Sequence, residues 1–147
     1  MSKTINIFFY KGKGDITDKL IRWWTKSEYS HVELAIGDLF YSTSPRDLKV
    51  RSKRITPKFE SWDYVTINVT NEQLEDIKLF YKETSNCKYD WLGIFFSQFI
   101  KVGVHHKDRW FCSEWVTASL KRAKILEVEY PHNYSPQDLK MLISGSK

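Results

Sequence analysis

Residues 31–43 read HVELAIGDLFYST, two short apolar runs separated by a Gly-Asp pair. Gly37 and Asp38 are typical of a two-residue hairpin turn, so the flanking runs are predicted to pair as antiparallel strands. Alternation along the first run places its three branched aliphatic residues on a core face, and His31 and Glu33 on the opposite face. The hairpin therefore predicts a sheet with one buried face and one face that carries ionisable side chains.

The segments on both sides of this hairpin alternate between predicted strands and helices. The chain has 147 residues, which suffices for one domain with its own core, spanning 1–147. The mixed order of elements favours the α+β class, with a small antiparallel sheet packed against helices. Strands are predicted at 4–10, 31–36, 39–43, 49–55 and 62–69, and helices at 16–26, 71–83, 90–100, 112–124 and 136–144.

The composition is that of a folded chain, since 41% of the residues are hydrophobic and 16% are aromatic. The net charge of +5 indicates a mild preference for anionic partners. The apolar run at the N-terminus is too short for a signal peptide, and no apolar run is long enough for a transmembrane segment. Two cysteines do not form a disulfide framework in a chain of this length. We therefore expect a soluble, cytoplasmic protein.

Residues 110–115 read WFCSEW and place Cys112 at the start of a predicted helix. Two interpretations are open. Cys112 shares one helix face with Trp115 and Val116, which is typical of a small buried core residue. The first turn of a helix also has unpaired N–H groups and a positive dipole end, which favour a thiolate and can hold an oxyanion. In the second interpretation Cys112 is a nucleophile.

His31 also has an ordinary and a functional interpretation. A histidine on the mixed face of a strand is usually a half-exposed side chain without a role. If the fold brings it to Cys112, it forms the thiolate–imidazole pair of a cysteine hydrolase or acyltransferase.

Several motifs connect these two residues to a known superfamily. YSHVEL at 29–34 is followed far downstream by YDWLG at 89–93 and FCSE at 111–114, and GD at 14–15 and LIR at 20–22 precede them. Over roughly residues 5 to 125 this pattern resembles the circularly permuted papain-like hydrolases. These are relatives of the NlpC-type cell-wall peptidases and of the lecithin–retinol acyltransferase group, in which the histidine strand precedes the cysteine helix. The resemblance implies that Cys112 is the nucleophile and His31 the general base, later the general acid.

The family pattern includes a third polar residue, which orients the imidazole from the neighbouring strand. With a two-residue turn this position falls near Ser44, where relatives often carry a stronger acceptor, so Ser44 departs from the pattern. Glu33 and Asp47 are alternatives for the same task. Glu33 also has the interpretations of a solvated carboxylate and of a residue that shapes the substrate pocket. The resemblance further suggests Tyr10, at the end of the first strand, as a helper at the oxyanion site, against the ordinary reading of an aromatic residue at a strand end.

The sequence thus predicts a thiol-dependent hydrolase of an amide or ester bond, a cysteine peptidase or amidase of phage or bacterial type. Its candidate substrates are peptides, peptidoglycan peptides and acyl lipids, and a cell-wall target requires release by a route other than a signal peptide. The alternative is a catalytically weakened member that binds or inhibits a host protein. No cofactor or metal is expected, because His105 and His106 lack zinc-ligand spacing to Cys87 or Cys112.

Six basic residues lie between positions 46 and 58. They indicate either a patch for an anionic partner such as nucleic acid, or an edge strand protected from mispairing by its lysines and arginines. No nucleic-acid motif accompanies them, so we favour the edge strand and consider nucleic-acid binding unlikely.

Overall fold

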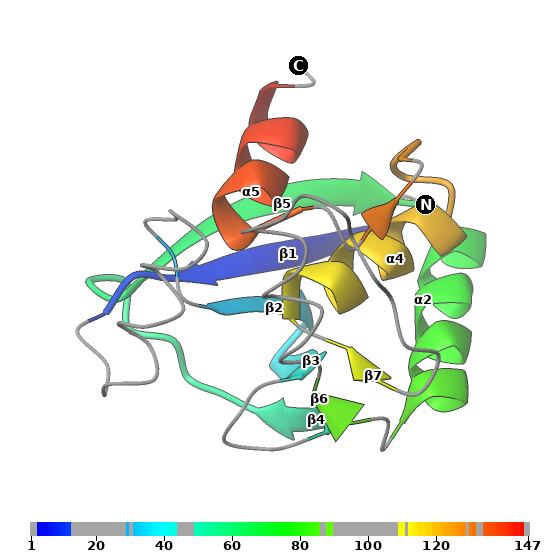
Figure 1. Cartoon of the computed structure of the whole chain (residues 1–147), viewed down its shortest axis with the longest axis horizontal. Coiled ribbons are helices and arrows are strands. Elements are labelled where there is room, and N and C mark those ends of the chain that lie inside the picture. The colour runs from blue at the N-terminus through cyan, green and yellow to red at the C-terminus, as the bar shows by residue number, and fades with distance from the viewer. Residues whose placement is uncertain are drawn as a thin grey trace.

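The computed structural model describes residues 3–12, 29, 31–43, 49–85, 88–89, 109–110, 112–128, 130–131 and 134–145. It has the predicted α+β class, with the elements arranged as in Figure 1. The strands are β1 (Lys3–Tyr10), β2 (His31–Ile36), β3 (Leu39–Thr43), β4 (Val50–Arg54), β5 (Trp62–Val69), β6 (Lys88–Tyr89) and β7 (Arg109–Trp110), and the helices are α2 (Asn71–Thr84), α4 (Cys112–Arg122) and α5 (Pro136–Gly145). The helices predicted at 16–26 and 90–100 lie outside the described residues.

The larger sheet has the strand order β4-β3-β2-β1-β5, and every neighbouring pair is antiparallel. The predicted hairpin is confirmed, since Leu34 lies opposite Tyr41 and Ile36 lies opposite Leu39. Gly37 in the turn has a φ of 63°, a left-handed conformation that glycine adopts without steric cost. The first strand of the chain takes the place between β2 and β5, so the strand carrying His31 is interior to the sheet rather than at its edge.

One face of this sheet carries the main hydrophobic core. Alternate residues of the central strands, such as Ile7 and Leu34, are completely buried there. Helix α4 packs against this core through Trp115 and Leu120, and the Trp115 indole N–H donates to Thr84 Oγ1 at the end of α2 over 2.8 Å. Burying a side chain of this size contributes about 1.5–3 kcal/mol, so apolar burial holds α4 to the sheet.

Helices α2 and α5 begin with reciprocal caps. The Gln73 N–H donates to Thr70 Oγ1 over 3.1 Å, and the Thr70 N–H donates to Gln73 Oε1 over 2.9 Å. Ser135 and Asp138 exchange the same two contacts, each at 3.1 Å, at the start of α5, where Pro136 is the first helical residue. These side chains satisfy N–H groups that the first turn of a helix leaves unpaired.

Helix α4 ends at Arg122, two residues before the predicted end. Lys124 has a φ of 60°, its N–H donates to the Lys121 carbonyl over 3.0 Å, and the Ile125 N–H donates to the Leu120 carbonyl over 2.8 Å. This is the Schellman arrangement, which usually has glycine at the left-handed position. Because lysine occupies that position here, the sequence carries no stop signal at this point.

The short strands β6 and β7 form a separate parallel pair, with Lys88 opposite Arg109 and Tyr89 opposite Trp110. The sequence prediction missed this pair and placed no strand at either position. Two-residue strands are too short to show the alternation from which strands are predicted. The pair joins the chain before residue 90 to the chain directly preceding Cys112.

Candidate active site

The sheet face opposite the main core gathers ionisable side chains on β2 and β4. Ser42 of β3 pairs with Arg51 of β4, and the hairpin register continues to place Glu33 of β2 opposite Ser42. On the other side of β2, Tyr10 of β1 lies opposite His31. The register therefore places an acid and an arginine on the same face of the sheet, separated by one strand that carries a small side chain.

Glu33 and Arg51 form a two-pronged ion pair across β3. Arg51 Nη1 donates to Glu33 Oε1 over 2.7 Å, and Arg51 Nη2 donates to Glu33 Oε2 over 2.6 Å. Only 1% of Glu33 and 8% of Arg51 are exposed. Ser42 leaves room for the guanidinium and donates its own hydroxyl to the Val32 carbonyl over 2.5 Å. Paired contacts of this kind fix the plane of a carboxylate as well as its position.

This ion pair corrects one interpretation made from the sequence and refines another. Glu33 is a buried carboxylate, so its interpretation as a solvated side chain is wrong. The favoured interpretation of the basic stretch as an edge strand is confirmed, since β4 lies at the edge of the sheet. Arg51 does not protect that edge, because it is buried, whereas Lys53 of β4 and Lys49 directly before it are exposed. The sequence contained one signal for this ion pair, the register of the paired strands. When the β2–β3 register is extended to β4, Glu33, Ser42 and Arg51 lie next to one another across the sheet.

His31 contacts the same carboxylate through Nε2, which pairs with Glu33 Oε2. Burial of the ring works against its charged form. The negative charge of Glu33 and hydrogen bonds to Cys112 and Glu33 outweigh burial and raise the pKa of His31 to about 9. Burial likewise opposes the charge of Glu33, but His31 and Arg51 hold the pKa of Glu33 below its ordinary value. At neutral pH the Glu33 carboxylate therefore lies between two cations, His31 and Arg51. We refer to these three residues as the charged row.

Cys112 is the first residue of α4 and lies close enough to His31 to contribute to the raised pKa of that ring. The fold thus brings together the two residues that the sequence could not connect. Cys112 is 2% exposed and is a free thiol. The predicted helix face of Cys112 is also buried, including Trp115, Val116 and Leu120. The burial of Cys112 agrees with its interpretation as a core residue. Its position at the helix start beside His31 agrees with its interpretation as a nucleophile.

Tyr10 lies beside this cluster, at the end of β1 and opposite His31. Its ring centroid is 5.0 Å from that of Trp62. A Cβ at Gly12 would come within 2.5 Å of the Tyr10 hydroxyl, so the absence of a side chain at Gly12 permits this position of the phenol. A role for Tyr10 at an oxyanion site stays a prediction.

Other residues singled out in the sequence fall outside the described part of the chain. Ser44, the family position for the third polar residue, and its alternative Asp47 are among them. So are the remaining cysteine and the histidine pair, Cys87, His105 and His106. Within the described ranges, no group of three or more His, Cys, Asp or Glu side chains is arranged to hold a metal ion.

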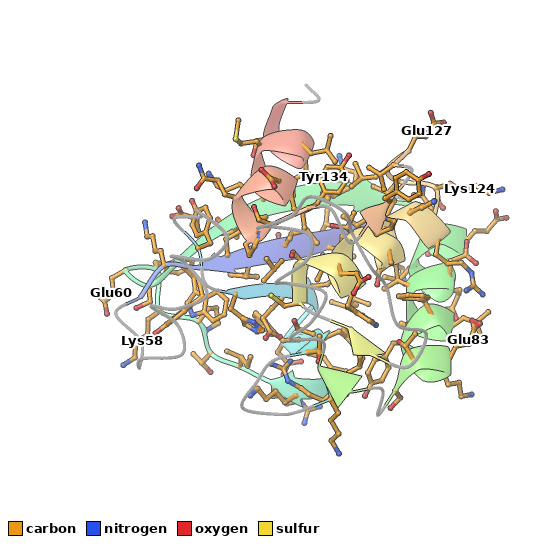
Figure 2. All side chains as sticks on the ribbon, in the orientation of Figure 1. Lys58, Glu60, Glu83, Lys124, Glu127 and Tyr134 are labelled. Atoms are coloured by element: carbon orange, nitrogen blue, oxygen red, sulfur yellow. The ribbon has the colours of Figure 1, made fainter. Side chains whose placement is uncertain are left out.

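The basic stretch is not a uniform positive surface. Arg51 is buried against Glu33, and Arg54 pairs with Asp38 at 3.2 Å. Lys58 lies near Glu60 in the segment before β5 (Figure 2). The described helices include none that is long and apolar enough to cross a membrane.

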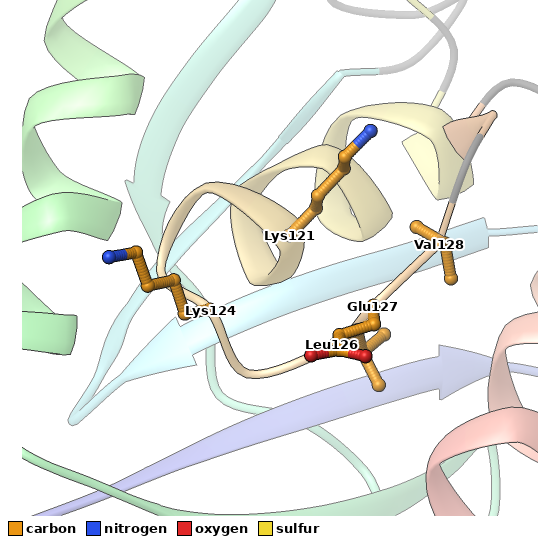
Figure 3. Close-up of a pocket in the computed structure, with 5 residues that line it drawn as sticks. All are labelled: Lys121, Lys124, Leu126, Glu127 and Val128. Carbon is orange, nitrogen blue, oxygen red and sulfur yellow. The ribbon is translucent and has the colours of Figure 1, made fainter.

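A surface pocket of about 500 Å³ lies at the opposite end of α4 from Cys112 (Figure 3). It is lined by Lys121, Lys124, Leu126, Glu127 and Val128. Lys121 and Lys124 point in different directions and present no common binding point. An eleven-residue helix is about 16 Å long, so this pocket is remote from the Cys112–His31 contact.

The chain matches no protein-family model, and it has no significant similarity to a curated protein.

Proposed function

We propose that the protein is a thiol-dependent hydrolase of an amide or ester bond, in which Cys112 is the nucleophile and His31 transfers protons. The observation that carries this proposal is the contact between Cys112, at the first position of α4, and a His31 ring that Glu33 holds. A protonated imidazole and a helix N-terminus both favour the thiolate form of a neighbouring cysteine.

The raised pKa of His31 sets the order of the proton transfers. In the proposed cycle the reactive form has the ring as an imidazolium, with Nε2 on Glu33, beside the thiolate that carries out the attack. The thiolate attacks the substrate carbonyl carbon, an S–C bond forms, and the C=O electron pair moves to oxygen. The N–H groups in the first turn of α4 stabilise this oxyanion.

His31 then acts as the general acid. It gives its proton to the leaving nitrogen or oxygen, the bond from that atom to the carbonyl carbon breaks, and a thioester remains on Cys112. The neutral ring next takes a proton from water, whose oxygen bonds to the acyl carbon. The S–C bond breaks, the carboxylic acid leaves, and the thiolate–imidazolium pair is restored.

The same geometry supports membership of the circularly permuted papain-like superfamily. An antiparallel sheet with the histidine strand packs against a later helix that starts with the cysteine, as the resemblance implies. We assign the third position to Glu33 rather than Ser44, because Glu33 contacts the ring directly from the same strand. Peptides, peptidoglycan peptides and acyl lipids all contain the required carbonyl and are the proposed substrate classes.

The proposal can be tested with p-nitrophenyl acetate, a small activated ester. We expect rapid release of one equivalent of nitrophenol, and peptide mass spectrometry should locate one acetyl group on Cys112. Cys87 is the internal reference in the same molecule. His31→Ala should slow acetylation by about 10²-fold, since general acid–base catalysis contributes about 10²–10⁴-fold. Acetylation of Cys112 no faster than that of Cys87 would contradict the proposal.

The burial of Cys112 favours a second candidate function, that of a module which keeps this fold and binds a host protein. In that case the charged row stabilises the sheet and the thiol is a core residue. The same experiment separates the two functions, because a binding module leaves Cys112 unacetylated while the chain stays folded.

A further inference from the structure

Arg51 is the one member of the charged row that the proposed chemistry has not used. It reaches Glu33 from β4, 18 positions further along the chain, and both nitrogens of its fork contact the carboxylate. An exposed ion pair could link these strands at a much smaller desolvation cost than the buried Glu33–Arg51 pair. Burying a guanidinium and a carboxylate costs several kcal/mol per ion, which the pairing only offsets when its geometry is good.

The proposed proton transfers at His31 require that Glu33 keep a cationic partner, and Arg51 is that partner. While His31 is protonated, Glu33 has two cationic neighbours, His31 and Arg51. When His31 passes its proton to a leaving group, one of these charges disappears. Without Arg51 the carboxylate would then be an unpaired anion in a buried site, which opposes release of the proton. With Arg51 the carboxylate keeps a partner in both states of the ring.

We propose that Arg51 is a positioning residue of the candidate active site, which holds the Glu33 carboxylate as a permanent, correctly oriented anion while His31 gives up and regains its proton. The inference rests on the proposed function of Cys112 and His31. It assigns the buried ion pair to the reaction and gives Ser42 a part in it, because a larger side chain on β3 would stand between Arg51 and Glu33.

The charged and titratable groups that act on His31 and Glu33 come from β2, β4 and α4. Glu33 is influenced by His31 of its own strand and by Arg51 of β4. His31 is influenced by Glu33 and by Cys112 of α4. The register places Tyr10 of β1 opposite His31, an aromatic hydroxyl rather than a further charge.

The test is the pH dependence of iodoacetamide alkylation at Cys112, compared between the wild type and three variants. Arg51→Met removes the charge and the fork. Arg51→Lys keeps the charge but cannot make both contacts. Arg54→Met is the matched control, because Arg54 lies on the same strand and its side chain is 81% exposed.

Removing a buried cation makes neighbouring acids hold their protons more tightly. We therefore expect Arg51→Met to move the alkylation curve upward by about one pH unit or more. In Arg51→Lys the midpoint of the alkylation curve should equal that of the wild type. On the high-pH plateau Cys112 should be alkylated about tenfold more slowly, because lysine holds the Glu33 carboxylate less precisely. The Arg54→Met curve should coincide with that of the wild type.

A purely structural ion pair gives a different result. It predicts a lower unfolding temperature for both Arg51 variants with alkylation curves that coincide with the wild type, and this outcome overturns the inference. If Arg51→Met fails to fold, as judged by circular dichroism, Arg51→Lys decides. A wild-type plateau rate in Arg51→Lys then overturns the inference, and a reduced rate at an unchanged midpoint supports it.

Failure of this inference differs from failure of the proposed function. The inference fails when wild-type Cys112 is activated and depends on His31 but is indifferent to Arg51. The proposed function fails when wild-type Cys112 labels no faster than Cys87, whatever residue occupies position 51.

Discussion

The two faces of the five-stranded sheet use buried side chains in opposite ways. On the helix-covered face, residues such as Ile7 and Leu34 are buried among other apolar side chains. On the other face, Arg51, Glu33 and His31 form a row in which each member has a charged or hydrogen-bonding partner. Apolar burial is non-directional, whereas a buried charge needs a partner at a defined distance. Substitutions on the first face should therefore change stability alone, whereas substitutions on the second should change reactivity as well as stability.

The largest expected effect is on reactivity. Cys112→Ala should abolish acetylation by p-nitrophenyl acetate at this site, because no other group in the proposed mechanism forms the acyl bond. The fold should persist, since the change removes a single sulfur atom from a helix start. Circular dichroism checks the fold, and a Cys112→Ala protein that still releases a full equivalent of nitrophenol in the fast phase would exclude thiol catalysis.

The next effect concerns the helix-covered face alone. Ile77 of α2 is completely buried, so Ile77→Ala should lower the free energy of unfolding by about 2–5 kcal/mol. Leu79→Ala on the same helix is the control, because Leu79 is 48% exposed and should change stability much less. Urea denaturation measures both. In the folded fraction, alkylation of Cys112 should stay at the wild-type rate for both variants, and a slower rate for Ile77→Ala alone would show that the two faces are coupled.

The pH dependence of stability probes the charged row. His31 has an ordinary pKa of 6.5 and a folded pKa of about 9, so its contribution is present below pH 6.5 and is lost as the pH rises through 9. The difference of 2.5 pKa units corresponds to about 3 kcal/mol. Glu33, whose pKa is lowered, contributes above its ordinary value of 4.5 and loses its contribution as the pH falls below it.

We therefore expect the wild type to lose about 3 kcal/mol more stability between pH 6.5 and pH 9.5 than a His31→Gln variant, in which this group does not titrate. Urea denaturation across this range gives the difference directly. Parallel stability curves for the two proteins would mean that the Glu33–His31 pair contributes nothing to the folded state.

The smallest effect distinguishes the two arginines of β4. Arg54→Met should change the free energy of unfolding by less than about 1 kcal/mol, because both members of the Arg54–Asp38 pair are exposed to solvent. Arg51→Met should cost clearly more, since it leaves a buried carboxylate with one cationic partner fewer. Equal losses in thermal unfolding of the two variants would remove the distinction between the buried and the exposed pair.

Much of the fold could be predicted because its signals are local. The turn at Gly37 and Asp38 specified the β2–β3 register, and the alternation that it implied separated His31 and Glu33 from the core. The predicted start of the helix at 71 is confirmed, and Thr70 caps it through a short-range pattern. The end of α4 was missed because Lys124 adopts a conformation that usually signals itself with glycine.

The candidate site could be predicted only in part because its contacts are long-range. Cys112 and His31 are 81 positions apart, and only a resemblance to a known superfamily connected them. Arg51 was missed because its contact with Glu33 depends on the register of two consecutive antiparallel strand pairs. On a strand with three basic residues, it has no local feature that distinguishes it from the exposed Lys53 and Arg54. The third residue was expected first at Ser44, which lies outside the described residues, and Glu33, named as an alternative, contacts the ring.

The central claim is that His31 is held between Glu33 and Cys112 as a charged ring. An NMR titration of the His31 ring, assigned by comparison with His31→Gln, tests it most directly. We expect His31 to stay protonated through neutral pH and to titrate near pH 9, and we expect Glu33→Gln to move the pKa of His31 markedly downward. Titration of wild-type His31 near 6.5, unchanged in Glu33→Gln, would contradict the account.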